Sequence, residues 1–160
     1  MKSAQVFTCP SNPAGGWLAM DGQFTISYGA NGHDQYNTPI RSIGGGRGVT
    51  SLAAINAPAQ CILITESNAG WSEMNMDGCW DWFDHNNASM PCGIFAGHMG
   101  NTNFIFADGH VKPMKPNATA SLNPPLNMWA IDGPNVLPFG GDGGANMMHQ
   151  LNEITKYYAR

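Results

Sequence analysis

Charged side chains are scarce in this sequence. They make up 11% of its 160 residues, against about a quarter in an average soluble domain. The chain has only 7 Lys and Arg residues against 11 Asp and Glu residues, and its formal net charge is −4. The basic residues form no patch. This balance argues against a nucleic acid or an anionic membrane surface as a partner.

Long apolar runs and the common catalytic signatures are also missing. No stretch approaches the ~20 apolar residues that span a bilayer. The Gly-rich segment 44–48 lacks the Lys-Ser/Thr ending of a phosphate-binding loop, and the chain has no Gly-x-Ser-x-Gly elbow. A metal-dependent hydrolase would need a His-rich constellation, which the sequence does not offer in one place. The sequence therefore predicts no enzyme.

The 4 cysteines form no C-x-x-C pair, which disfavours a zinc ribbon or a thioredoxin-like site. Their even number fits an oxidising compartment. Cys79 and Cys92 flank a loop dense in Trp, Asp and Asn, and closing it removes roughly 3 kcal/mol of unfolded-chain entropy. We therefore expect a Cys79–Cys92 disulfide, with Cys9 and Cys61 as the remaining pair. Free buried thiols are the alternative.

What the chain does have is glycine, proline and short patterned segments. A length of 160 residues suits a single domain, 1–160, and the 20 Gly and 11 Pro residues predict long ordered loops. Aliphatic, aromatic and alternating runs predict strands at 24–28, 61–66, 102–107 and 110–113. Thr50 or Ser51 can cap a short helix that ends at Ile55. Trp129 is a candidate anchor of the coil 117–144 onto the core.

The C-terminal segment has the spacing of an amphipathic helix. Met147, Leu151, Ile154 and Tyr158 recur at intervals of three or four residues, which predicts a helix over 145–158. Together with the strands, this helix predicts an α+β fold dominated by an antiparallel sheet.

A hairpin is the strongest local signal in the sequence. Asp108-Gly109 separates two short strand-like runs, and Gly109 can adopt the positive φ that a tight turn needs. His98 precedes this dipeptide by nine intervening residues. We expect His98 and Asp108 to form a hydrogen-bonded structural pair, because a catalytic dyad would need a nucleophile that the sequence does not supply.

The spacing from His98 to Asp108-Gly109 resembles the H-X9-DG motif of bacterial type IV pilin-like and pseudopilin-like proteins. Further pieces match that family in order and cover roughly positions 5 to 113. They are Val6-Phe7-Thr8-Cys9-Pro10, Ile26-Ser27-Tyr28-Gly29, Leu52 to Pro58, and Ile62-Leu63-Ile64-Thr65-Glu66-Ser67.

The resemblance implies a structural role as the globular head of a subunit in a surface filament or a type II secretion-type apparatus. It implies other pilin-like subunits as partners, identical copies among them, and an extracellular, cell-surface or periplasmic location. The family normally begins with a leader-peptidase site and a long apolar helix, whereas this chain begins at Met1 within the globular domain. In the family, that helix makes the membrane contact. The resemblance therefore implies no membrane contact for this segment.

The excursion 66–99 carries two further candidate sites. Asp77, Asp81 and Asp84 form the densest acidic cluster, and carboxylate oxygens suit calcium. Major pseudopilins of type II secretion systems have a calcium site in a C-terminal loop, which favours this interpretation; a solvated acidic loop is the alternative. Four aromatic residues of the same excursion suggest a sugar-stacking platform or a lid over the sheet: Trp71, Trp80, Trp82 and Phe83. A secreted carbohydrate-binding or calcium-binding surface module is thus the alternative function.

Overall fold

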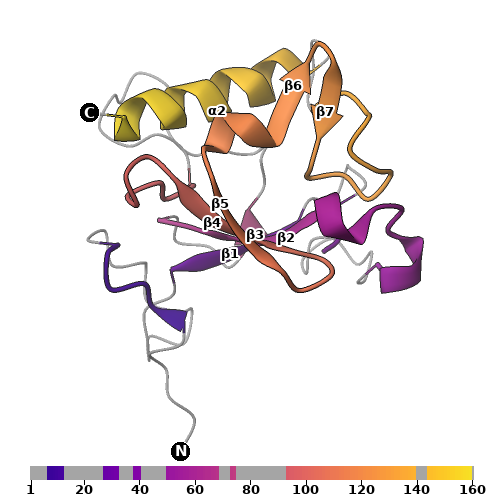
Figure 1. Cartoon of the computed structure of the whole chain (residues 1–160), viewed down its shortest axis with the longest axis horizontal. Helices are drawn as coiled ribbons and strands as arrows, with labels where there is room; N and C mark the ends of the chain where they lie inside the picture. The colour runs from indigo at the N-terminus through magenta and orange to yellow at the C-terminus, as the bar shows by residue number, and fades with distance from the viewer. Residues whose placement is uncertain are drawn as a thin grey trace, which may run out of the picture.

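The main element of the fold is a five-stranded sheet (Figure 1). The computed structural model describes residues 7–12, 27–32, 38–40, 50–68, 73–74, 93–139 and 144–159. The strands are β1 (Tyr28–Asn31), β2 (Ile62–Glu66), β3 (Glu73–Met74), β4 (Thr102–Phe106) and β5 (Val111–Met114). Their order is β3-β1-β2-β4-β5, and all neighbours are antiparallel except β1 and β3. A sheet-dominated α+β fold is confirmed.

The β4–β5 hairpin follows the predicted pattern. Ile105 pairs with Val111, and Asp108-Gly109 lies in the connecting turn. Gly109 has φ 94°, and its amide donates to the carbonyl of Phe106 at 2.9 Å. The positive φ explains why glycine follows Asp108, since other residues adopt it only at a cost.

Strand β1 lies later in the chain than its expected range of 24–28, and residues 24–26 lie outside the described part. The strand pairs Tyr28 with Glu66 of β2. At its other end, the buried Asn31 amide donates to the carbonyls of Ile62 at 2.7 Å and Trp129 at 2.8 Å. These tertiary bonds position a segment whose Gly and Asn residues have low intrinsic strand propensity.

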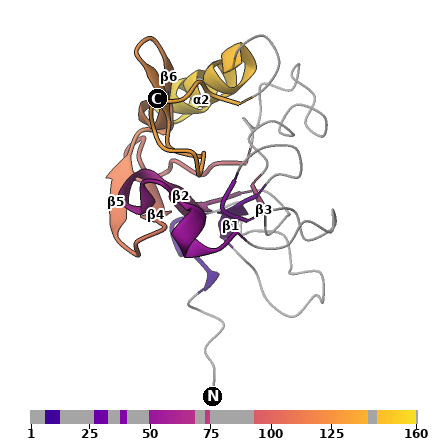
Figure 2. The same ribbon diagram turned by 90° about the vertical axis from the view of Figure 1, so that its right-hand side faces the viewer.

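A second layer covers one side of this sheet. It consists of the helix α2 (Ala145–Tyr158) and the small antiparallel sheet of β6 (Ala120–Leu122) and β7 (Pro125–Asn127), as both views show (Figures 1 and 2). The predicted helix over 145–158 is confirmed. Met147, Leu151 and Ile154 are its buried residues, and their spacing places them on one helical face.

The core lies between these two layers. Its buried residues come from β2, β4, β5, β6, α2 and the connecting segments: Ile62, Ile94, Ala96, Phe104, Phe106, Met114, Ala120, Trp129, Met147, Leu151 and Ile154. Trp129 is fully buried and donates its indole N–H to the Thr119 hydroxyl at 2.9 Å. It therefore anchors the coil to the core as expected.

The helix expected to end at Ile55 is a single 3-10 turn, Leu52–Ala54, with no side-chain cap from Ser51. The Thr50 hydroxyl donates to the carbonyl of Thr38 at 3.3 Å instead. A second 3-10 turn, Pro58–Gln60, leads into β2. In the described part of the chain, no helix has both the length and the apolar character that crossing a membrane requires.

Candidate functional site

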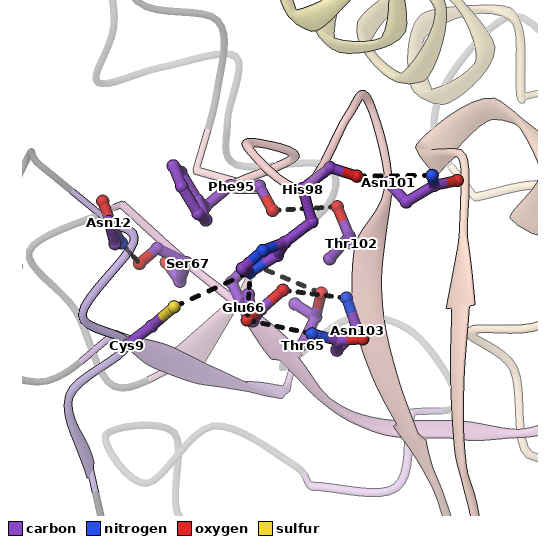
Figure 3. A network of polar contacts seen from close by, with 10 residues as sticks. All are labelled: Cys9, Asn12, Thr65, Glu66, Ser67, Phe95, His98, Asn101, Thr102 and Asn103. Atoms are coloured by element: carbon purple, nitrogen blue, oxygen red, sulfur yellow. Dashed lines mark hydrogen bonds and ion pairs between the residues drawn. The ribbon is translucent and has the colours of Figure 1, made fainter. Parts of the chain in front are cut away.

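A buried carboxylate stands at the end of β2 (Figure 3). Glu66 is the last residue of β2 and is only 1% exposed, although its side chain is charged. Its Oε2 accepts from the backbone N–H of Asn103 at 2.8 Å, and its Oε1 accepts from the Asn103 side chain at 3.2 Å. Its Oε1 also lies 2.9 Å from Nε2 of His98. Such contacts offset the cost of removing a carboxylate from water.

A tight turn holds His98 over this carboxylate. Asn101 donates both its backbone N–H (3.1 Å) and its side-chain N–H (3.3 Å) to the His98 carbonyl. Between them, Met99 has φ 57° and Gly100 has φ 80°. The Phe95 ring also packs against the imidazole in a T-shaped arrangement, with ring centroids 5.6 Å apart. Backbone and neighbours together fix the ring position.

Cys9 reaches the same place from the N-terminal segment. Its Sγ lies 3.7 Å from Nε2 of His98, and the residue is 5% exposed. Asn12 holds this segment against the sheet, because its side chain donates to the Ser67 carbonyl at 2.9 Å. Donor atoms of Cys9, Glu66 and His98 all lie within 4.8 Å of one another. Three distant segments thus build one cluster (Figure 3).

The geometry of this cluster differs from that of a catalytic relay. In a nucleophile–His–acid triad, the nucleophile contacts one ring nitrogen and the acid contacts the other. Here Cys9 and Glu66 both face Nε2 of His98. A proton cannot pass through the ring from one to the other in this arrangement. The three side chains instead converge on a single point.

Tyr28 lies beside the cluster, directly opposite Glu66 in the β1–β2 register. Burial, followed by the charges of Glu66 and Cys9, raises the pKa of its phenol. The tyrosine also borders a hollow of about 400 Å³, which is lined by Phe7, Tyr28, Ile64, Asn103, Ile105 and Val111. Asn103 and Ile105 alternate along β4 with the core residue Phe104, so the hollow lies on the sheet face away from α2.

The expected hydrogen bond between His98 and Asp108 is wrong. Asp108 bonds to His110 instead, with Oδ1 2.7 Å from the ring Nδ1 and 3.1 Å from the backbone N–H. These bonds lower the pKa of the Asp108 carboxyl. The reason is β4, which separates the two motif residues: a five-residue strand is about 17 Å long. His98 stands before the strand and Asp108 after it, and Gly109 shapes the turn.

The expected Cys9–Cys61 disulfide is also wrong, since both thiols are free and buried. Cys61 directly precedes β2, whereas Cys9 meets Glu66 at the far end of that strand. A disulfide needs Cα atoms within about 7 Å of each other, so the strand length forbids the bond. Burial raises the pKa of the Cys61 thiol to about 12.

Several predicted site residues lie outside the described residues. They are the disulfide pair Cys79 and Cys92, the acidic cluster Asp77, Asp81 and Asp84, and the aromatic residues Trp71, Trp80, Trp82 and Phe83. The disulfide, the calcium site and the sugar platform therefore stay predictions.

Sequence reasoning missed the grouping of Cys9, Glu66 and His98. A signal was present, because each residue belongs to a piece that resembles the pilin-like family: the Cys-Pro segment, the acid-Ser strand end and the H-X9-DG motif. Glu66 also ends an aliphatic run in the sequence, and a charged residue in such a run is rarely buried unless it is paired.

Comparisons of the chain with models of protein families, with curated proteins and with solved structures give no match.

Proposed function

We propose that this chain is the globular head of a pilin-like or pseudopilin-like subunit, with a structural role in a bacterial surface filament or a type II secretion-type apparatus. The observation that carries the proposal is that residues from the family-like sequence pieces contact one another in the interior. Glu66 accepts from Asn103, His98 contacts Glu66, and Cys9 contacts His98. Residues that tie distant segments together suit a scaffold.

The surroundings of the cluster also suit a structural role. Cys9 and Glu66 both face the same ring nitrogen of His98, which does not serve a proton relay. In this proposal the motif stabilises the head, and the surfaces of the head contact neighbouring subunits, identical copies among them. The protein works outside the cytoplasm, at the cell surface or in the periplasm.

The test is to locate the protein on the bacterium that encodes it. Antibodies raised against the purified 160-residue chain are used for immunogold labelling and for blots of mechanically sheared surface material. We expect label along filaments or at envelope assemblies, with the antigen in the high-molecular-mass sheared fraction. Antibodies preadsorbed with the purified chain are the control. Antigen found only in the cytoplasm would overturn the proposal.

The same fractions test the alternative of a secreted surface module. Monomeric protein in the culture medium, with quenching of tryptophan fluorescence by oligosaccharides, would favour carbohydrate binding over assembly.

A further inference from the structure

We propose that Cys9, Glu66 and His98 form a binding site for a zinc ion. The three side chains offer a thiolate sulfur, a carboxylate oxygen and an imidazole nitrogen, with donor atoms within 4.8 Å of one another. Zinc takes this combination of donors in proteins, whereas calcium and magnesium prefer sets made of oxygen alone. The site is independent of the proposed filament function, and it is distinct from the predicted calcium loop.

The two ligand distances from His98 come close to those of a tetrahedral zinc site. With Zn–S near 2.3 Å and Zn–N near 2.0 Å, sulfur and nitrogen ligands stand about 3.6 Å apart. Sγ of Cys9 and Nε2 of His98 are 3.7 Å apart. Nitrogen and oxygen ligands stand about 3.4 Å apart, and the Glu66 contact with Nε2 is 2.9 Å. A shift of roughly half an ångström by Glu66 therefore makes room for the ion.

The convergence on Nε2 is what distinguishes this cluster from a hydrogen-bonded chain. Sγ of Cys9 and Oε1 of Glu66 approach the same ring nitrogen of His98. One hydrogen on Nε2 serves one acceptor well, but a metal at that position contacts all three atoms. Binding moves the imidazole hydrogen to Nδ1 or to water, and the Cys9 thiol gives its proton to solvent.

The surroundings already position the three ligands. Asn103 donates twice to Glu66, at 2.8 and 3.2 Å, which is the outer-shell support that metal-binding carboxylates receive. The His98 side chain is 32% exposed, while that of Glu66 is 2% exposed. Water can therefore reach the site from the imidazole side and take the fourth position. The bound ion would connect the N-terminal segment, the end of β2 and the turn before β4.

Metal binding by the full chain tests this proposal. The reduced, chelator-treated protein is titrated with Zn²⁺ against a chromophoric chelator, and with Co²⁺ as a spectroscopic substitute. We expect one zinc equivalent and a thiolate-to-cobalt charge-transfer band. Cys9→Ala and Glu66→Gln should weaken this binding at least 10-fold, and Asn103→Ala by 10- to 100-fold, as for other outer-shell changes. Cys61→Ala removes a second buried thiol away from the site and should bind like the wild type.

A measurement on the wild type alone covers the case in which a variant does not fold. Alkylation of each cysteine is followed by peptide mapping with and without Zn²⁺, and with Ca²⁺ as the control ion. We expect zinc to slow the alkylation of Cys9 and to leave the alkylation of Cys61 unchanged. Calcium should change the alkylation of neither cysteine. Equal Cys9 alkylation with and without zinc overturns the proposal. So does a cobalt–thiolate band that persists in a folded Cys9→Ala variant.

Discussion

His98 and Asp108 belong to one sequence motif, but their surroundings differ. The Glu66 partner of His98 is buried, whereas the side chains of Asp108 and His110 are 38% and 42% exposed. We expect His98→Ala to lower the free energy of unfolding by about 2 kcal/mol, because a buried carboxylate loses a hydrogen-bond partner. Asp108→Ala should change it little, because water screens the exposed pair. Urea denaturation compares the two variants, and equal losses would contradict this distinction.

The turn glycine tests backbone conformation separately from packing. Gly109 has φ 94°, and a Cβ added there meets nothing within 4 Å. Any cost of substitution therefore comes from the backbone. We expect Gly109→Val to destabilise the protein by about 2 kcal/mol and Gly109→Asn by clearly less, since Asn tolerates the left-handed region. Thermal unfolding ranks the variants; an Asn variant as unstable as the Val variant would exclude this explanation.

The buried Cys61 thiol should make the stability of the protein sensitive to alkaline pH. Burial raises its pKa from 9.0 to about 12 in the folded protein, while in the unfolded chain the thiol ionises near its ordinary value. Its contribution to stability is therefore complete below pH 9 and is lost as the pH rises toward 12. The free energy of unfolding, measured between pH 9 and pH 12, should decline more steeply in the wild type than in Cys61→Ala. Parallel curves would show that the thiol does not titrate in this way.

At the scale of elements, α2 holds the second layer on the sheet. Leu151 is fully buried in the core cluster, whereas the Lys156 side chain is 71% exposed on the same helix. We expect Leu151→Ala to cost about 3 kcal/mol, because it leaves a cavity between helix and sheet. Lys156→Ala should leave the unfolding midpoint close to that of the wild type. A comparable loss in both variants would contradict this assignment to packing, and helix propensity could not explain it, because Ala forms helices better than Leu or Lys.

The helix and the hairpin could be predicted because their determinants are local. The spacing of Met147, Leu151 and Ile154 defines a buried helical face, and α2 has the predicted limits. Asp108-Gly109 likewise determines its own turn. Strand β1 was misplaced because Asn31 depends on carbonyls 31 and 98 residues away. Periodicity within a short window contains no information about such partners.

The candidate site is nonlocal in the same way. Cys9 and His98 are 89 residues apart, and Glu66 lies 32 residues before His98. No spacing rule links such positions, and the motif suggested Asp108 as the partner because it is near in sequence. The length of β4 separates that pair, while the pairing of β2 with β4 brings Glu66 to Asn103 and His98.

At the scale of the whole molecule, the predicted disulfide between Cys79 and Cys92 would link two points of one long segment. We expect a disulfide between them, which would stabilise the fold by roughly 3 kcal/mol through the entropy of the unfolded chain. Peptide mapping without reduction should recover the two cysteines in one linked fragment, with Cys9 and Cys61 as free thiols. Alkylated Cys79 in protein that was never reduced would contradict the pairing.

The place of α2 in the chain bears on how the protein folds during synthesis. The described strands of both sheets precede the helix, yet its residues Met147, Leu151 and Ile154 complete the core that β2 and β4 begin. A ribosome releases the strands first. Until residues 145–158 emerge, the nascent sheet presents an uncovered apolar face, which is a surface that chaperones bind. The synthesis of residues 145–158 therefore decides whether the nascent core closes or stays open to aggregation.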